Sequence, residues 1–246
     1  MDSSIFYALT LAAALIRPVY SIDLPDYTGL KIAQNGSILT VTFHNPSSPI
    51  NLWNLATQND LTDLVIIFNI TIGAIEGRAR GAGNEFLVSL DMRFATKGES
   101  LFGQPEVGSG LFPGGGGSQF LPGLIGRGRA MEYVLSSNDI TAEDAAEIGW
   151  INKAFDTSAE MYGYIGKLAQ RFSWFPLSAL HGGKKTINRA SAPSLEQIIK
   201  DTKDFFKQKF NSEAQAIAKR SAALSRYISA VDLELNLPQS IARLYI

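Results

Sequence analysis

Apolar and polar residues alternate with strand periodicity near the start of the chain. Residues 30–34 and 38–43 both alternate in this way, and the Asn-Gly pair at 35–36 has the composition of a hairpin turn. Residues 65–68 and 70–75 are instead short continuous apolar runs, which are typical of strands buried on both faces. The first part of the chain therefore predicts a hairpin and two further strands.

Helical periodicity takes over along the rest of the chain. Apolar residues recur at helical spacing in residues 52–64, and a short helix at 85–90 precedes a strand at 92–95. The last third of the chain is almost entirely amphipathic helix, as at residues 161–172 and 195–210. Strands that alternate with short helices and then give way to a helical tail predict an α/β fold of the mixed α+β kind.

The same pattern suggests how the chain is divided. Residues 22–155 carry the predicted strands and form the expected core, residues 156–246 form a helical C-terminal portion, and residues 1–21 form an apolar leader. Within the core, Thr141 begins a capping box for a helix that Gly149 ends. No linker composition separates these parts, so we expect a single globular domain.

Composition and charge narrow the classes of partner. The chain has 246 residues, 22 Lys and Arg against 23 Asp and Glu, and a net charge of −1. This balance gives no electrostatic reason to expect nucleic acid or an anionic membrane as a partner. There is no cysteine, and the two histidines, His44 and His181, lack the spacing of metal ligands. We therefore expect no metal site.

The leader leaves two alternatives open. Residues 5–16 are apolar apart from Thr10, a length that fits the hydrophobic region of a signal peptide and is too short for a stable membrane span. The residues before it carry an acid and no base, which a signal peptide does not favour. The second alternative is a buried or frayed leader helix.

Two glutamates lie in surroundings that favour acid–base chemistry. Glu85 follows a glycine-rich stretch at 77–83, which predicts a turn before a helix, and Glu106 follows Gly103 and Pro105. A carboxyl group among apolar and glycine residues is partly desolvated, which raises its proton affinity towards the range of a general acid or base. The alternative is that both are ordinary exposed charges, because charged side chains mostly face water.

The glycines add possible anion donors. A glycine-rich turn that enters a helix exposes backbone N–H groups, which could hold a developing oxyanion. Glycine can equally be present only because a tight turn needs positive φ. These patterns leave the function open.

Six segments of the chain form an ordered series of motifs, at residues 75–95, 102–108, 113–119, 121–122, 125–126 and 142–152. In this order and at this spacing they resemble the enoyl-CoA hydratase/isomerase (crotonase) family. The resemblance is dense from about residue 72 to 155 and looser from 38 to 51 and in the helical tail.

The resemblance implies a fold, a reaction and site residues. The fold would be a crotonase-like ββα spiral core, and the substrate an acyl-CoA thioester, with coenzyme A part of the substrate and no separate cofactor. Glu85 would orient and activate water, Glu106 would supply the α-carbon proton, and the Ala82 amide would be one oxyanion donor. Substrate-binding positions would be Gly81, Gly83, Pro113 and Gly114.

Other family properties follow from the same resemblance. The protein partners would be further copies of this chain, in a homotrimer or a hexamer. An acyl-CoA substrate favours an intracellular compartment (cytoplasm, mitochondrion or peroxisome), whereas the leader favours the secretory pathway. The remaining alternatives are a non-catalytic acyl-CoA-binding or scaffold member of the fold, and an isomerase or tailoring enzyme of specialised-metabolite biosynthesis.

The chain departs from the family pattern around residues 64–71. The family has a long stretch between the strands that correspond to 65–68 and 72–75, and here only residues 69–71 separate them. We interpret this as internal deletions that remove the second oxyanion amide and part of the CoA-binding wall. Losing one oxyanion donor typically costs about 100- to 1000-fold in rate, so the activity is expected to be impaired.

Overall fold

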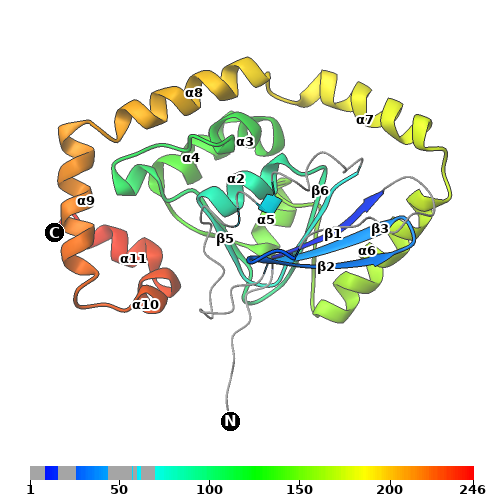
Figure 1. Ribbon diagram of the computed structural model, residues 1–246. Coiled ribbons are helices and arrows are strands. Elements are labelled where there is room, and N and C mark those ends of the chain that lie inside the picture. Colours follow the sequence, from blue (N-terminus) through cyan, green and yellow to red (C-terminus); the bar gives the residue numbers. More distant parts are fainter. Residues whose placement is uncertain (1–8, 16–25, 44–56, 58–59, 62–69) are drawn as a thin grey trace, which may run out of the picture. The chain divides into compact units, whose positions relative to one another are not determined.

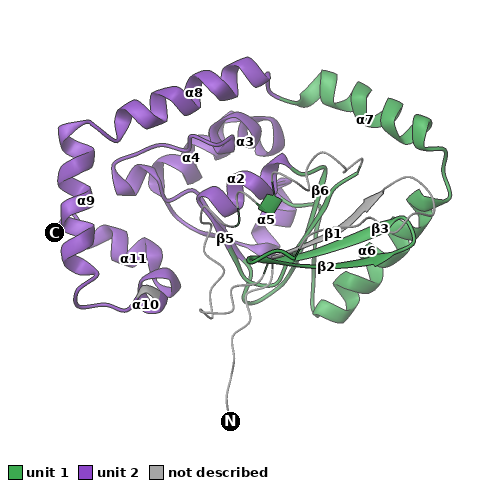
Figure 2. Ribbon diagram, in the orientation of Figure 1, with its two compact units in different colours: residues 1–78, 90–100, 151–192 green, residues 79–89, 101–150, 193–246 purple. Residues whose placement is uncertain are grey.

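The computed structural model describes residues 9–15, 26–43, 57, 60–61 and 70–246. The predicted strand at 65–68 and the proposed deletions before residue 70 lie outside these residues. Thr57, Asp60 and Leu61 are helical, which agrees with the helix predicted around them. The described chain forms two compact units, and both contain separate stretches of sequence (Figure 2).

Unit 1 comprises residues 1–78, 90–100 and 151–192. Its six-stranded sheet has the order β2-β3-β1-β4-β6-β9. Figure 1 labels β1, β2, β3 and β6 of this sheet. The pairs among β2, β3, β1 and β4 are antiparallel, and β4, β6 and β9 run parallel. The strands are β1 (Leu9–Leu15), β2 (Leu30–Asn35), β3 (Ile38–Phe43), β4 (Ile72–Ile75), β6 (Met92–Thr96) and β9 (Lys153–Phe155).

The predicted hairpin is confirmed with its turn one residue later. Asn35 pairs with Ile38, so Gly36 and Ser37 form the two-residue connection, and Gly36 has φ of 58°. Positive φ at the first turn position is what a tight hairpin turn requires, and glycine adopts it without steric cost.

The apolar leader contributes a strand to this sheet. Residues 9–15 form β1, which pairs with β3 on one side and with β4 on the other. The leader-helix alternative is therefore wrong for these residues. A strand here gives hydrogen-bond partners to the facing edges of β3 and β4, whose backbone groups a helix would leave unpaired.

One helix closes the face of the sheet. α6 (Ser158–Ser173) buries Met161, Ile165 and Ala169 against the apolar side chains of β4, β6 and β9, including Phe94. These buried positions recur at helical spacing, which is why the sequence pattern predicted α6. Unit 1 ends in α7 (Leu177–Ser191). Within the described part of the chain, no helix is both long and apolar enough to cross a membrane.

Unit 2 comprises residues 79–89, 101–150 and 193–246, with a small sheet of order β5-β7-β8. The strands are β5 (Arg78–Arg80, which begins at the unit boundary), β7 (Leu101–Gly103) and β8 (Ile140–Thr141). The helices are α2 (Ala82–Ser89), η1 (Val107–Ser109), α3 (Gly117–Ile125), α4 (Arg127–Ser136), α5 (Ala142–Ile148), α8 (Leu195–Gln208), α9 (Ser212–Leu224), α10 (Ala230–Leu235) and α11 (Leu237–Ala242).

Local end signals in unit 2 were predicted well. The Thr141 hydroxyl accepts from the Asp144 N–H and begins α5, and Gly149 ends the helix with φ of 89°. The glycine-rich stretch at 77–83 was predicted as a turn, and this is wrong for three of its residues, because they form β5. Edge-strand pairing with β7 explains the difference, since it depends on residues distant in sequence. The mixed α/β class itself is confirmed.

Candidate active site

Glu85 lies in the first turn of α2 and is 8% exposed. Gly81 has φ of 51°, which turns the chain out of β5, and its carbonyl accepts from the Glu85 N–H at 2.9 Å. The apolar side chains of Leu87 and Val88 anchor the helix in the core of unit 2. The helix predicted at residues 85–90 is confirmed with its start three residues earlier, at Ala82, and the predicted desolvation of Glu85 agrees with its burial.

Two backbone amides hold the Glu85 carboxylate. Its Oε1 accepts from the N–H of Gly115 at 2.6 Å and from that of Gly117 at 3.1 Å. The pKa of Glu85 is raised overall, because the effect of burial is larger than the opposing effect of these two N–H groups, which stabilise the charged form. The glycine run before α3 therefore supplies donors for a carboxylate on α2. No pattern in the sequence indicated what these amides bind.

Glu106 lies between β7 and η1, and its side chain is half-buried. Its Oε1 is 3.1 Å from the position that a Cβ on Gly81 would occupy, so the carboxyl group reaches the turn at the start of α2. Burial and the charge of Glu85 raise the pKa of Glu106 to about 8, and the Glu106 backbone N–H acts in the opposite direction.

The two glutamates therefore act on each other within unit 2. Glu85 has two backbone donors that favour its anion, whereas the negative charge of Glu85 favours the neutral form of Glu106. Two nearby carboxyl groups whose environments separate their proton affinities are the usual arrangement of a base and an acid. Near neutral pH the pair can hold one proton, on Glu106.

The glycines around α2 differ in what their amides can do. The Gly81 N–H donates to the Gly103 carbonyl at 3.1 Å, so it is already engaged. Ala82 is the first residue of α2, and first-turn amides have no acceptor within their own helix. Gly83 follows in the same turn. Ala82 and Gly83 are therefore the positions whose amides could donate to an anion, and the oxyanion role of Ala82 stays a prediction.

Gly114, which follows Pro113, packs against α8. The Gly114 carbonyl accepts from the Thr202 hydroxyl at 2.5 Å, and a Cβ on Gly114 would lie 2.4 Å from the Phe205 ring. Both residues are buried. The contacts of Gly114 give it a structural reason to be glycine, since α8 leaves no room for a side chain.

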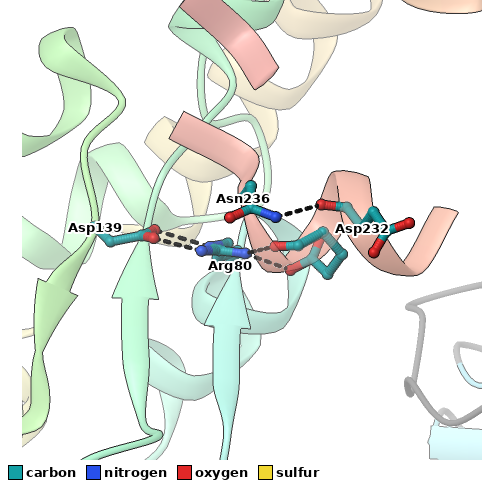
Figure 3. A network of polar contacts seen from close by, with 5 residues as sticks. Arg80, Asp139, Asp232 and Asn236 are labelled. Carbon is teal, nitrogen blue, oxygen red and sulfur yellow. Dashed lines mark hydrogen bonds and ion pairs between the residues drawn. The ribbon is translucent and has the colours of Figure 1, made fainter. Parts of the chain in front are cut away.

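The sequence did not single out Arg80, the last residue of β5, whose side chain is 4% exposed. Its guanidinium forms a two-pronged ion pair with Asp139, with Nε 2.8 Å from Oδ1 (Figure 3). It also forms an ion pair with Glu234 of α10, in which Nη1 is 2.9 Å from Oε1. Burial lowers the pKa of Arg80, and the two carboxylates outweigh that effect and raise it. In the same view the Asn236 amide donates to the Asp232 carbonyl at 3.1 Å. This network ties α10 to the strand that leads into α2.

Metal ions need groups of ligand side chains. Among the residues that the structure describes, no group of three or more His, Asp or Glu side chains could hold a metal ion. The sequence prediction of a metal-independent site stays a prediction, because His44 is outside the described residues.

Comparison with known proteins gives the family context. The sequence model of the enoyl-CoA hydratase/isomerase family matches residues 35–227. The short-chain-enoyl-CoA hydratase of Clostridium acetobutylicum is 33% identical over 144 residues, which are 58% of this chain and 54% of that protein. The crotonyl-CoA hydratase of Syntrophomonas wolfei is also 33% identical over 144 residues, which cover 58% of this chain and 55% of that one.

Solved structures give the same result. A proposed enoyl-CoA hydratase from Streptomyces avermitilis superposes with a TM-score of 0.67 at 38% identity, covering 71% of this chain and 62% of that one. The chain spans about half the length of the curated relatives named above.

The close approach of Gly115 to Glu85 predicts the effect of one substitution. A Cβ on Gly115 would lie 2.7 Å from Oε2 of Glu85. We expect Gly115→Ala to push the carboxylate off its two amides and to reduce kcat in the reaction proposed below by about 10- to 100-fold, since small misplacements of catalytic groups are costly. Gly128→Ala is the matched control, because a Cβ there meets nothing within 4 Å. Equal kcat in both variants would contradict the prediction.

Proposed function

The chain belongs to the enoyl-CoA hydratase/isomerase family, and from this we propose that it adds water across the α,β double bond of an enoyl-CoA thioester. The observation that carries the proposal is the glutamate pair, in which two backbone amides bind the Glu85 carboxylate and the pKa of Glu106 is raised to about 8. Its two relatives named as hydratases support the same reaction class.

The proposed mechanism assigns one proton movement to each glutamate. The Glu85 carboxylate accepts a proton from water as the water oxygen attacks the β-carbon. The thioester oxygen gains negative charge in this step, and the Ala82 N–H stabilises it. Glu106 then delivers its proton to the α-carbon, which completes the addition. Coenzyme A is part of the substrate, and the step needs no further cofactor.

The interpretation of residues 64–71 as a deletion belongs to the same proposal, although most of them lie outside the described structure. We propose that the deletion removes a second oxyanion donor. The experiment is to purify the chain and to measure hydration of a short enoyl-CoA by the loss of absorbance of the conjugated thioester. A second chain with the corresponding stretch of a relative inserted after residue 69 is measured beside it. Hydration by neither chain would reject the proposed function, and equal turnover by both would reject the deletion.

The proposed assembly is a homotrimer or hexamer that uses the helical tail. α8 has no buried residue, and three of its apolar side chains are exposed to 70% (Leu195), 45% (Ile199) and 55% (Phe206). An apolar helix face of this kind is typical of a surface that another chain covers. The mass of the purified chain by light scattering tests this, and a monomer at micromolar concentration would contradict it.

An intracellular compartment is proposed from the substrate class, because acyl-CoA thioesters are intracellular metabolites. The pairing of β1 on both sides supports retention of residues 9–15 in the folded chain rather than their removal as part of a signal peptide. A C-terminal fluorescent fusion tests the compartment.

A further inference from the structure

A series of buried polar side chains leads from α5 to Glu106. The Trp150 indole N–H donates to Oδ1 of Asn84 at 3.0 Å. With the Gln104 amide nitrogen turned towards Glu106, its Oε1 accepts from Nδ2 of Asn84 at 2.7 Å, and its Nε2 donates to the Glu106 oxygens at 2.9 and 3.2 Å. Trp150, Asn84 and Gln104 have 0% exposure, so their polar groups cannot form hydrogen bonds with bulk water instead.

The indole determines the direction of every bond in this series. Tryptophan has an N–H donor and no acceptor at that nitrogen, so the Asn84 group that faces it must be the oxygen. The other half of the Asn84 amide is then a donor, and the Gln104 group facing it must be an oxygen. That leaves the Gln104 NH₂ as the group that meets Glu106. Reversing either amide would place two acceptors or two donors against each other, which is costly in a buried site.

The surroundings hold the series in place. The Trp150 ring meets the Tyr133 ring edge-on at 5.6 Å, and its backbone N–H donates to the Ala145 carbonyl at 2.8 Å. A Cβ on Gly117 would lie 2.5 Å from the terminal atom of the Gln104 amide that is Oε1 in this orientation, so the amide fills the space above that glycine. Gln104 thus lies between Glu106 and the residue whose N–H holds Glu85.

We infer that Trp150, Asn84 and Gln104 are positioning residues, an amide relay in which the indole N–H keeps a hydrogen-bond donor, and not an acceptor, turned towards Glu106. The inference rests on the proposed function for its catalytic meaning. A carboxylic acid that meets an amide N–H accepts through its unprotonated oxygen, so its O–H stays available for the substrate. A carboxylic acid that meets an amide carbonyl would instead give its O–H to that carbonyl.

The relay also opposes the other influences on the acidity of Glu106. Among the described residues, Glu85 on α2 is the titratable group whose charge acts on Glu106, and it disfavours the anion. Arg80 on β5 is bound to Asp139 and Glu234, and the glycine run before α3 has no charge. An N–H donor from Gln104 stabilises the Glu106 anion and keeps the acid strong enough to release its proton.

The test removes the indole N–H and leaves the aromatic packing. In Trp150→Phe, Asn84 loses its fixed orientation and Gln104 can turn its carbonyl to Glu106. We expect the pKa of Glu106 to move upward by about one pH unit, the scale of one hydrogen bond to a charged group. We expect kcat to fall about 10- to 100-fold, as for other residues that orient a catalytic group, with KM little changed and the alkaline limb of the pH profile displaced to higher pH.

The Glu106 carboxyl is followed directly by ¹³C NMR titration of protein labelled at the glutamate carboxyl carbons, with the signal identified by its absence in Glu106→Gln. This readout does not depend on turnover. Tyr133→Phe is the matched control, since it alters the same ring pair and leaves the indole N–H; it should titrate as the unmodified protein does. Gln104→Met removes the last donor, and Trp150→Phe should add nothing to it.

The outcomes separate the two proposals. A shifted Glu106 titration in Trp150→Phe and in Gln104→Met supports the relay, even if the protein hydrates no enoyl-CoA, in which case only the proposed function falls. An unshifted titration in a folded Trp150→Phe protein overturns the relay, whatever the activity. If phenylalanine at 150 prevents folding, Asn84→Leu interrupts the same series, and an unshifted titration there overturns it equally.

Discussion

Glutamine in place of either Glu85 or Glu106 is expected to reduce kcat for hydration by about 10²- to 10⁴-fold, the usual contribution of a general acid or base. The two losses have different causes. In Glu85→Gln an amide cannot take a proton from water, and one orientation of its NH₂ would oppose the Gly115 and Gly117 donors. In Glu106→Gln the side chain has no acidic proton to deliver.

The measurement is steady-state hydration of a short enoyl-CoA, with binding of the saturated acyl-CoA measured separately by calorimetry. Glu147→Gln is the matched control, because Glu147 is an exposed acid on α5. Both site variants should keep acyl-CoA affinity within a few fold. The unmodified chain could instead show no turnover and bind acyl-CoA as well as both variants do. That result would identify the chain as a non-catalytic acyl-CoA-binding member of the fold, which is one of the alternatives from the sequence.

Local signals explain which parts of the fold could be predicted. The capping box at Thr141 and the glycine after α5 act within one helical turn, so the sequence contains everything that determines them. The place of β1 in the sheet was not predictable in this way. Residues 9–15 pair with β3 and with β4, which lies about 60 residues further along the chain, and strand pairing has no local signature comparable to a helix cap.

The site also has a part that the sequence could predict and a part that it could not. The family motifs identified Glu85 and Glu106, and in unit 2 the structure buries Glu85 and half-buries Glu106. Nothing local to those motifs could indicate that the amides of Gly115 and Gly117 bind Glu85. The one available hint was composition: a run of four glycines exposes more backbone N–H than a turn needs.

Arg80 shows what local pattern omits entirely. An arginine in a three-residue strand would ordinarily be taken as exposed. Here Asp139, 59 residues later, and Glu234, 154 residues later, provide its partners, so burial of the charge depends on the completed fold. A buried charge with both partners present is tolerated, whereas the same charge or its partners left alone would be costly.

Arg80→Met is therefore expected to lower the free energy of unfolding by about 3–5 kcal/mol, the typical cost of breaking a buried ion pair from one side. Methionine fills much of the volume, but Asp139 and Glu234 keep their charges without the guanidinium. Arg80→Lys should recover only part of the loss, because an ammonium group cannot make the two-pronged contact with Asp139. Urea unfolding followed by circular dichroism measures all three proteins.

The control is the exposed ion pair of Lys207 and Asp204, whose side chains are 77% and 46% exposed. Lys207→Met should leave the free energy of unfolding almost unchanged, because water and salt already screen such a pair. A cost for Arg80→Met no larger than this would mean that α10 does not depend on the guanidinium.

If the predicted loss is found, it also bears on catalysis, because β5 ends at Arg80 and the turn at Gly81 sets the first residues of α2. Loosening that strand would displace the Ala82 amide and Glu85 together, so kcat should fall in Arg80→Met even at urea-free, fully folded conditions.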